Sequence, residues 1–449
     1  MARTMDMTRG KILPLLASFA LPLMAGNVCQ LLYSVADSAV VGRVLGVQAF
    51  AAVGAAGFYS WLVTDIVLGF SQGFGVVLAQ RFGGKDISAL RRTAAMLVLL
   101  GLLLAVALNG ASQALIGPVL RLTGIPEDIR LQSHTYLRWL LAGVPAMVAY
   151  NLAAAMLRAL GNSRAPLTAV IVSCVSNVGL NLLFSAVFGW GVAGVALATV
   201  AAQTFSFLCC FVVLCRVSEM RLRAGDFRVD AAAVRQLLRL GVPPALRNAV
   251  TSLGGLFVQR QINRYGTLFV AGVTASYKYF DLMNIVSGGL EGAVATFSAQ
   301  NYGAGNLPRV RSGIRTAAAV GLVSSVAIGL VIILLRRWLI GVLVTGSEAD
   351  MAAILASGSQ SLLAMALFLP ALYLLFVYRA GIQGMGNALI PTLSGFTELA
   401  VRVAAVLTMP SWIGVWGIHF AMPLGWAAAW VLLNLSYYVI YRSRCRQMQ

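Results

Sequence analysis

Charged residues are scarce in this sequence. They make up 10% of its 449 residues, whereas 59% of the residues are apolar. The mean hydropathy of +0.85 is too high for a water-soluble domain, so soluble folds are excluded. At about 20 apolar residues per membrane crossing, the length allows roughly ten to thirteen helices and leaves no room for a large extramembrane domain.

The sequence also has few residues that catalyse reactions. It has 14 acidic residues and 2 histidines, and it contains no H-E-x-x-H and no G-x-S-x-G motif. It has no G-x-x-x-x-G-K-[ST] phosphate loop, and an isolated GIQGMG at 381–386 has neither a strand before it nor a trailing acid. We therefore expect no enzyme and no organic cofactor, and we expect transport to be driven by an ion gradient.

Metal, nucleic-acid and targeting signals are missing as well. The six cysteines form no C-x-x-C motif and have no histidine at ligand spacing, so no metal site is expected. The 33 basic residues, which give a net charge of +19, are spread between apolar runs, so they indicate membrane topology and not nucleic-acid binding. No signal-peptide cleavage site precedes the first apolar run, which we expect to remain as a membrane helix.

Twelve apolar runs can be counted, and they predict an all-α integral membrane protein with twelve transmembrane helices. Basic residues concentrate in the terminal segments and in every second connection, so the positive-inside rule places both termini in the cytoplasm. The runs lie at 12–41, 48–80, 92–117, 131–157, 165–188, 192–215, 238–263, 270–301, 312–343, 355–380, 390–410 and 412–441.

An internal repeat divides the chain. An arginine-rich segment predicts a cytoplasmic linker at 216–237 between an N-lobe at 1–215 and a C-lobe at 238–449. One nearly constant offset aligns three pairs of segments, namely SFALPLMAGN with RLGVPPALRN, LAQRFGGKD with SAQNYGAGN, and LRALGNSRAP with IQGMGNALIP. Six helices per lobe give both lobes the same orientation, which indicates a parallel repeat and favours a carrier that works by alternating access.

A polar stripe on the first run contains an acidic residue. Asn27, Gln30, Ser34 and Asp37 are spaced three, four and three residues apart, which places them on one face of a helix. An ionisable group at membrane depth is costly to bury, so Asp37 is a functional candidate. Pro22 removes a backbone hydrogen bond from the same helix and permits a kink, so we expect it to act as a hinge.

Uncharged polar residues on later runs are candidate partners of Asp37. Asn177, Asn181 and Thr199 can hydrogen-bond a carboxyl group in either protonation state. Asp37 is then a proton carrier, an oxygen ligand for Na⁺, or a structural acid in a satisfied network. Asp65, in the middle of the second run, either meets a base on another helix or lines the cleft between the lobes.

The second half has its own ionisable candidates at membrane depth. Lys278 and Asp281 have i, i+3 spacing, and Glu398 and Arg402 have the favourable i, i+4 spacing, so each pair can neutralise itself. The Glu398–Arg402 pair reads as structural. Arg247 could form an ion pair with one of the acids. The C-lobe candidates are Lys278, Asp281, Glu291, Glu398 and Arg402.

Several motifs together resemble those of a known family. They include FALPLMAGNVCQLLYSVADSAVVGRVLG at 19–46, NVGLNLLF at 177–184, GWGVAGVALATVAAQ at 189–203 and AQNYGAGN at 299–306. With these motifs the chain resembles the multidrug and toxic compound extrusion (MATE) transporters, most closely their bacterial DinF-like branch. The resemblance implies a V-shaped pair of six-helix bundles in the inner membrane that exports cationic, amphipathic compounds in exchange for H⁺ or Na⁺.

The same resemblance implies an N-lobe ion site at Asp37, Asn177, Asn181 and Thr199. Asn181 stands where the family pattern has Asp. Losing one carboxylate weakens a Na⁺ site, so the resemblance favours H⁺ coupling here. The basic residue of the C-lobe pattern matches Lys278, but the acid that usually follows two residues later is Phe280, with Asp281 displaced by one position.

Two other functions remain open at this point. A flippase for a lipid-linked precursor would need arginines suited to phosphate in the cleft, for which Arg247 and Arg402 are candidates. A membrane-embedded enzyme would need a nucleophile and a base within reach of each other. The expected partners are small organic cations and membrane lipid, without nucleic acid, and we expect a monomer.

Overall fold

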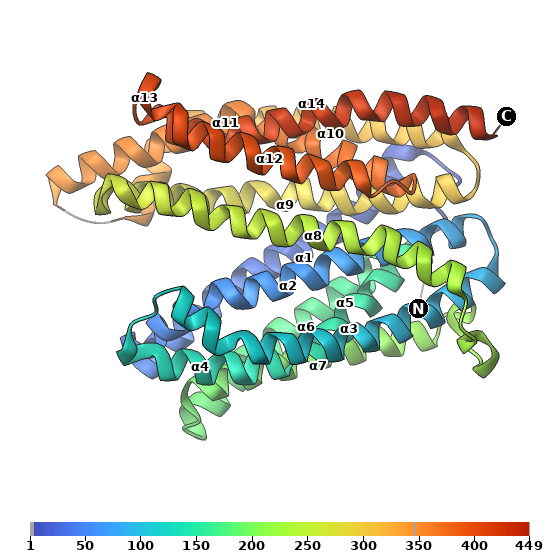
Figure 1. Cartoon of the computed structure of the whole chain (residues 1–449), viewed down its shortest axis with the longest axis horizontal. Coiled ribbons are helices and arrows are strands. Elements are labelled where there is room, and N and C mark those ends of the chain that lie inside the picture. Colours follow the sequence, from blue (N-terminus) through green and yellow to red (C-terminus); the bar gives the residue numbers. More distant parts are fainter. Residues whose placement is uncertain (1–3, 345–346, 449) are drawn as a thin grey trace. The chain divides into compact units, whose positions relative to one another are not determined.

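The computed structural model describes residues 4–344 and 347–448, and within these ranges the chain is helical and contains no strand (Figure 1). The protein is therefore an all-α membrane protein, as its composition predicts. The first half contains α1 (Ile12–Val40), η1 (Val41–Leu45), α2 (Gly46–Gly83), α3 (Ile87–Leu122), α4 (Glu127–Ala142), α5 (Val144–Ala159), α6 (Arg164–Asn181), η2 (Leu182–Val187) and α7 (Gly191–Cys215). The segments η1 and η2 are π-helical.

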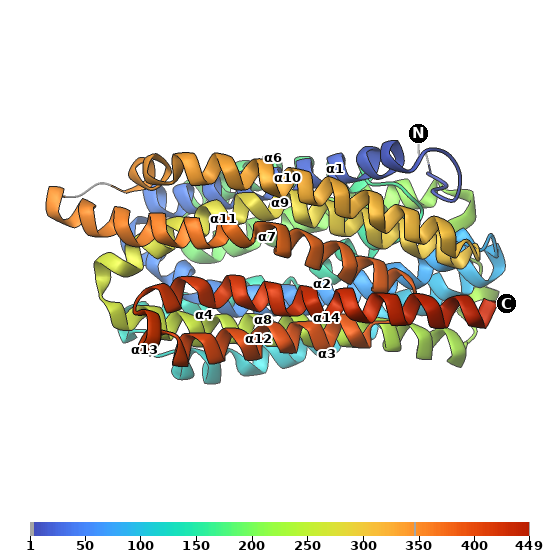
Figure 2. The ribbon, with the colours of Figure 1, turned by 90° about the horizontal axis from the view of Figure 1, so that it is seen from above.

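The second half begins with two short 3₁₀ turns and continues with long helices, as Figure 2 shows from above. Its elements are η3 (Ser218–Met220), η4 (Ala224–Phe227), α8 (Ala231–Ile262), η5 (Asn263–Tyr265), α9 (Thr267–Gly303), α10 (Leu307–Leu343), α11 (Glu348–Gly384), α12 (Leu389–Thr408), α13 (Pro410–Ile413) and α14 (Trp416–Met448).

Each of the twelve apolar runs corresponds to a helix or a helix pair in the described part of the chain. Eight helical stretches there are long and apolar enough to cross a membrane, and the 72-residue stretch Ile12–Gly83 contains the first two runs. The run predicted at 131–157 is broken into α4 and α5, which meet at a bend of 45°. Pro145, near the start of α5, lacks the N–H group that would continue the helix from α4.

The chain folds as two compact units. Among the described residues, one unit contains residues 4–7 and 21–245, and the other contains residues 8–20, 246–344 and 347–448. Two helices therefore pass from one unit to the other, α1 between Ala20 and Leu21 and α8 between Ala245 and Leu246. Both crossing points adjoin prolines inside helices, Pro22 in α1 and the Pro243–Pro244 pair in α8.

The internal sequence repeat corresponds to turns that have the same structure in both halves of the chain. Asp86 accepts a hydrogen bond from the backbone N–H of Ala89 at 2.9 Å and caps α3, and Asn306 caps α10 in the same way through Arg309 at 3.1 Å. The turns before α6 and α12 also match, because both use a glycine with positive φ, +79° at Gly161 and +80° at Gly386. These backbone angles are favourable for glycine, which explains why the glycines recur at one offset.

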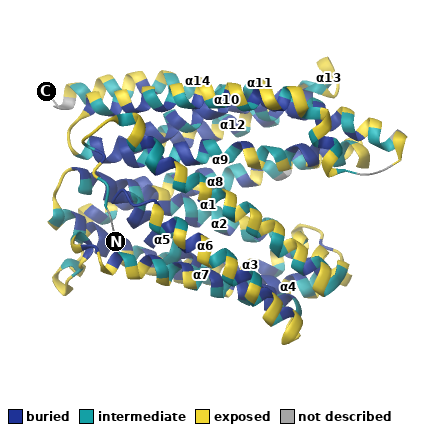
Figure 3. Cartoon of the chain, turned by 180° about the vertical axis from the view of Figure 1, so that it is seen from behind, coloured by how far each residue is buried: buried dark blue, intermediate teal, exposed yellow. Residues whose placement is uncertain are grey.

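In the first unit, α2 packs against α3, α4 and α5, and α7 packs against α5 and α6. A close approach joins α2 to the first part of α8, because a Cβ atom at Gly73 would lie 1.9 Å from the carbonyl oxygen of Leu240. In the second unit, α11 lies among α9, α10 and α14, and α12 runs beside α14. Large exposed apolar residues such as Val323 and Leu334 lie along α10, and exposed positions recur on the outer helices in Figure 3, as expected for lipid-facing surfaces.

Candidate functional site

Helices α1, α6 and α7 bring the four predicted ion-site residues into one hydrogen-bonded chain. The Nδ2 group of Asn181 donates to Oδ1 of Asp37 and, over 2.7 Å, to Oδ1 of Asn177. The Nδ2 group of Asn177 in turn donates to the hydroxyl oxygen of Thr199 at 3.4 Å. The four-residue spacing of Asn177 and Asn181 places both amides on the face of α6 that meets the acid.

Tyr33 completes this chain of hydrogen bonds. The hydroxyl of Thr199 donates to the carbonyl oxygen of Val195 at 3.1 Å, so its oxygen is an acceptor for other groups. The hydroxyl of Tyr33, 3.3 Å away, therefore donates to Thr199. Tyr33 lies one helical turn before Asp37 on α1, so both side chains project from the same face.

The network is buried and still has an open acceptor. Asn177 and Asn181 have no exposed surface, whereas Asp37 is half-buried. Among the described residues, the carbonyl oxygen Oδ1 of Asn181 has no hydrogen-bond partner. Such an oxygen can accept a proton donor or coordinate a cation, and it lies on the residue that already holds Asp37.

Asp37 borders a cavity of about 210 Å³ in the first unit. Three of the predicted candidates line it, Asp37, Ser34 and Thr199. The wall further consists of side chains from α1, α2, α4, α5 and α7 that the sequence did not point to, namely Tyr33, Ser60, Thr64, Tyr136, Leu140, Leu141, Val144, Met147 and Gln203. The i, i+4 spacing to Asp37 was a signal for Tyr33, whereas the others come together only through the fold.

The other candidates predicted in the first half lie away from this cavity. Asn27, Gln30 and Asp65 are not among the described residues that line this cavity. Asn27 precedes Asp37 by ten residues, which is about 15 Å along a helix, so a cavity of this size does not reach it. Asn27 and Asp65 are half-buried and Gln30 is exposed. Pro22 lies still further from Asp37, toward the start of α1, and the helix continues through it.

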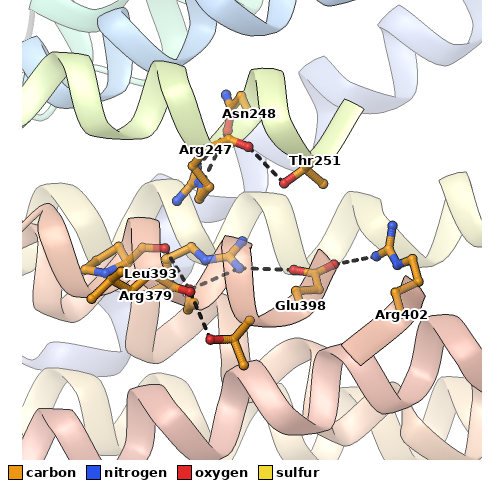
Figure 4. A network of polar contacts seen from close by, with 10 residues as sticks. Arg247, Asn248, Thr251, Arg379, Leu393, Glu398 and Arg402 are labelled. Carbon is orange, nitrogen blue, oxygen red and sulfur yellow. Dashed lines mark hydrogen bonds and ion pairs between the residues drawn. The ribbon is translucent and has the colours of Figure 1, made fainter. Parts of the chain in front are cut away.

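The second unit contains a buried network of charges, shown in Figure 4. Arg402 donates to Oε1 of Glu398 at 2.5 Å, so the pair that was expected from spacing is present. Arg379 of α11 reaches the other oxygen, Oε2, at 3.4 Å and was not expected. The three residues have between 5% and 7% of their surface exposed, so this ion pair lies in the interior of the unit.

The other C-lobe candidates are arranged differently. Glu291 of α9 lies within electrostatic reach of Arg247 and Arg379. Arg247 also donates to Oδ1 of Asn248 from Nη2 at 3.0 Å (Figure 4). Among the described residues, Lys278 and Asp281 do not form the ion pair that their spacing allows; Asp281 is exposed, and exposed pairs gain little from closing.

The atoms of this site that could coordinate a cation are the oxygens of one carboxylate, of amides and of hydroxyls. Within residues 4–344 and 347–448, no group of three or more His, Cys, Asp or Glu side chains is arranged to hold a metal ion. The arrangement can therefore hold a proton on Asp37 or offer neutral oxygens and one negative charge to a monovalent cation.

Comparison with known proteins identifies a family model and full-length relatives. The model of the MatE family matches residues 22–183 and 243–406, once in each half. The probable multidrug resistance protein YpnP of Bacillus subtilis is 26% identical and covers 97% of this chain and 96% of its own length. The probable multidrug resistance protein YoeA of the same organism is 29% identical, with 95% and 93% covered. A crystal structure of MATE in the bent conformation superimposes with a TM-score of 0.91 at 21% identity, covering 99% of this chain and all of the other.

Proposed function

Since the chain belongs to the MatE family and is thus a transporter and not an enzyme, we propose that it is a secondary active antiporter that exports cationic, amphipathic compounds in exchange for H⁺. The observation that supports this proposal is the position of Asp37, beside a polar cavity and hydrogen-bonded to a buried amide. The full-length relatives named multidrug resistance proteins support export of organic compounds.

Coupling follows from competition for one carboxylate. The charged form of Asp37 attracts a cationic substrate, and its protonation removes that attraction. A substrate drives alternating access only through its different affinity for the two states, so this loss of affinity supplies the coupling. The carboxyl group is held in place by the hydrogen-bonded chain of Asn181, Asn177, Thr199 and Tyr33. Pro22 lets α1 rearrange when the proton binds.

Proton coupling is favoured over Na⁺ coupling by the number of carboxylates. Na⁺ is held best by several oxygen ligands that include negative charge, and Asp37 is the one acid in this hydrogen-bonded chain. The carbonyl oxygen of Asn181 has no partner among the described residues, and an amide oxygen can accept a hydrogen bond from a protonated carboxyl group.

The setting of this activity is part of the proposal. The basic residues of the connections favour the bacterial inner membrane with both termini in the cytoplasm. Each unit contains its own buried polar network, so transport by a monomer is the simplest arrangement, and it requires no nucleic acid and no organic cofactor.

Ethidium uptake into inverted vesicles with an imposed pH gradient, which corresponds to export from the cell, tests the role of Asp37. Asp37→Asn keeps the hydrogen-bonding shape and removes the titratable group, so export should fall to the background of empty vesicles. Asp128→Asn, which changes an exposed acid on α4, is the matched control and should keep the parent rate. A parent-like rate for Asp37→Asn would remove this carboxyl group from the mechanism.

Transport of a lipid-linked precursor is the second candidate. The observation that favours it is the set of buried arginines in the second unit, because guanidinium groups bind phosphate well. Glu398 already occupies two of these arginines, which is why export of organic compounds is the first candidate.

A further inference from the structure

Two arginines share one acid in the interior of the second unit. Arg379 and Arg402 approach different oxygens of Glu398, so both carboxylate oxygens are used by this one group (Figure 4). The exposed fractions are 6% for Arg379, 5% for Arg402 and 7% for Glu398. The three side chains together carry a charge of +1 in a part of the chain that lies among membrane helices.

This positive charge is not neutralised within the group. Glu398 is the one carboxylate that both guanidinium groups contact, so one of the two positive charges has no counter-charge among these three side chains. Glu291 of α9 interacts electrostatically with Arg379 but also with Arg247, so adding both of these residues leaves three guanidinium groups and two carboxylates. A buried uncompensated charge is expensive in a membrane environment unless a ligand or water compensates it.

Hydrogen-bond donors are left over at the same place. Among the described residues, the Nε groups of Arg379 and Arg402 are buried and have no hydrogen-bond partner. A buried donor without an acceptor destabilises the folded protein, so an oxygen-bearing anion would relieve both the charge and the missing bonds. The planar guanidinium group fits the two oxygens of a carboxylate or a phosphate especially well.

The surrounding helices are shaped around these side chains. A Cβ atom at Gly425 of α14 would lie 2.9 Å from the backbone carbonyl oxygen of Glu398 and 3.3 Å from its Cγ, so this glycine lets α14 approach α12 closely beside the acid. The guanidinium carbon of Arg379 lies 5.5 Å from the ring centre of Phe376, where a cation–π contact helps to hold it in place. The two guanidinium groups are therefore held in fixed positions by their surroundings.

We propose that Arg379 and Arg402, with Glu398 as the internal competitor, form an anion site that takes a carboxylate or phosphate group. The inference rests on the proposed transport function and deepens it, because the preferred cargo would carry an acidic group in addition to its cationic group and amphipathic body. Glu398 occupies the guanidinium groups in the absence of cargo, and the acidic group of the cargo then shares them.

Binding to the purified full-length protein in detergent tests the site without any ion gradient. The probe is benzoate, its neutral isostere benzamide is the control compound, and the readout is the thermal unfolding midpoint at constant ionic strength. Benzoate should raise the midpoint in a saturable way and benzamide should not. Because the measurement involves no transport, failure of proton-driven export would leave this result intact, and the reverse also holds.

Variants of the arginines and of the acid should change benzoate affinity in opposite directions. Arg379→Gln and Arg402→Gln should weaken benzoate binding by at least about thirtyfold, because each removes a buried charged donor. Glu398→Gln removes the competing acid and should strengthen binding, so a failure of the arginine variants to fold leaves the site testable. Arg442→Gln changes an exposed arginine of α14 and should leave binding unchanged.

A second arm separates a soluble acid from a lipid headgroup. The same variants are placed in nanodiscs of phosphatidylcholine with or without phosphatidylglycerol. The site takes a lipid phosphate if phosphatidylglycerol stabilises the parent protein but not Arg402→Gln and also abolishes the benzoate shift. The site takes a soluble acid if phosphatidylglycerol has no such effect and the benzoate shift remains. The proposal is overturned if no probe stabilises the protein, or if the shifts persist in both arginine variants.

Discussion

Asn181 donates a hydrogen bond to Asp37 from a position 144 residues further along the sequence. The contact joins α6 to α1 and places an amide where the family pattern has a second acid. An amide can hold a carboxyl group in either protonation state, whereas a second carboxylate would repel it or share a cation with it. We therefore expect the identity of residue 181 to decide which ion this unit prefers.

Asn181→Asp should create a preference for Na⁺. Two carboxylates side by side attract a cation more strongly than one, so we expect Na⁺ binding to tighten on the order of tenfold, about 1.4 kcal/mol. Substrate uptake driven by an imposed Na⁺ gradient at fixed pH would measure the change, with K⁺ in place of Na⁺ as the ionic control. Asn181→Leu, which removes the amide without adding charge, should not gain this response. Equal rates in Na⁺ and K⁺ for Asn181→Asp would contradict the argument.

Thr199→Val should destabilise the protein through the donors that it leaves behind. The amide of Asn177 and the hydroxyl of Tyr33 both lose their acceptor, and each such loss costs about 1–3 kcal/mol when the donor is buried. The thermal unfolding midpoint of the purified protein should fall clearly. Thr168→Val is the matched control, because exposed Thr168 likewise bonds a carbonyl four residues earlier. Similar midpoints for the two variants would mean that the Tyr33 and Asn177 bonds contribute little.

The sequence predicted those parts of the site that depend on helical spacing. Asn181, which contacts Asp37, is hydrogen-bonded to Asn177 because residues four apart share a face of the helix. Tyr33 has the same spacing to Asp37, but an aromatic residue in an apolar run reads as a packing residue. Arg379 escaped notice because it lies at the end of the run 355–380, where basic residues read as loop charge, and its acid comes from another helix.

The fold was predictable where a local rule decided it. The repeated Gly–Asn turns and the capping residues Asp86 and Asn306 recur at a nearly constant offset, so the duplication could be read directly. The bend between α4 and α5 was not predicted, although Pro145 lies beside it, because one continuous apolar run covers both helices. The spacing of Lys278 and Asp281 allowed an ion pair, but spacing alone does not supply the burial that makes such a pair worth forming.

Gly73→Ala should disturb the contact between α2 and the first part of α8. The added Cβ atom would lie 1.9 Å from a backbone carbonyl oxygen, which cannot rotate away as a side chain could. We expect a loss of about 1–3 kcal/mol in the free energy of unfolding, or more if the helices cannot separate. Gly54→Ala in the same helix meets no atom within 4 Å and should instead stabilise by up to about 1 kcal/mol. Urea or thermal unfolding of the two variants side by side distinguishes a packing effect from helix propensity.

Pro22→Ala tests whether the proline gives α1 the flexibility that transport needs. Alanine restores a backbone N–H group that can bond the carbonyl of Ser18, and a proline inside a helix costs about 3 kcal/mol, so the variant should be at least as stable as the parent. If α1 bends at this position during the cycle, the stiffer helix should slow substrate export several-fold.

The place of Pro22 makes this outcome specific. It lies two residues after Ala20, where α1 passes from one compact unit to the other, and Pro243 marks the corresponding crossing in α8. Pro118→Ala changes a proline inside α3, a helix that stays within one unit, and should leave export unchanged. Export by Pro22→Ala at the parent rate, with equal or higher stability, would show that a proline at this crossing is not needed for movement.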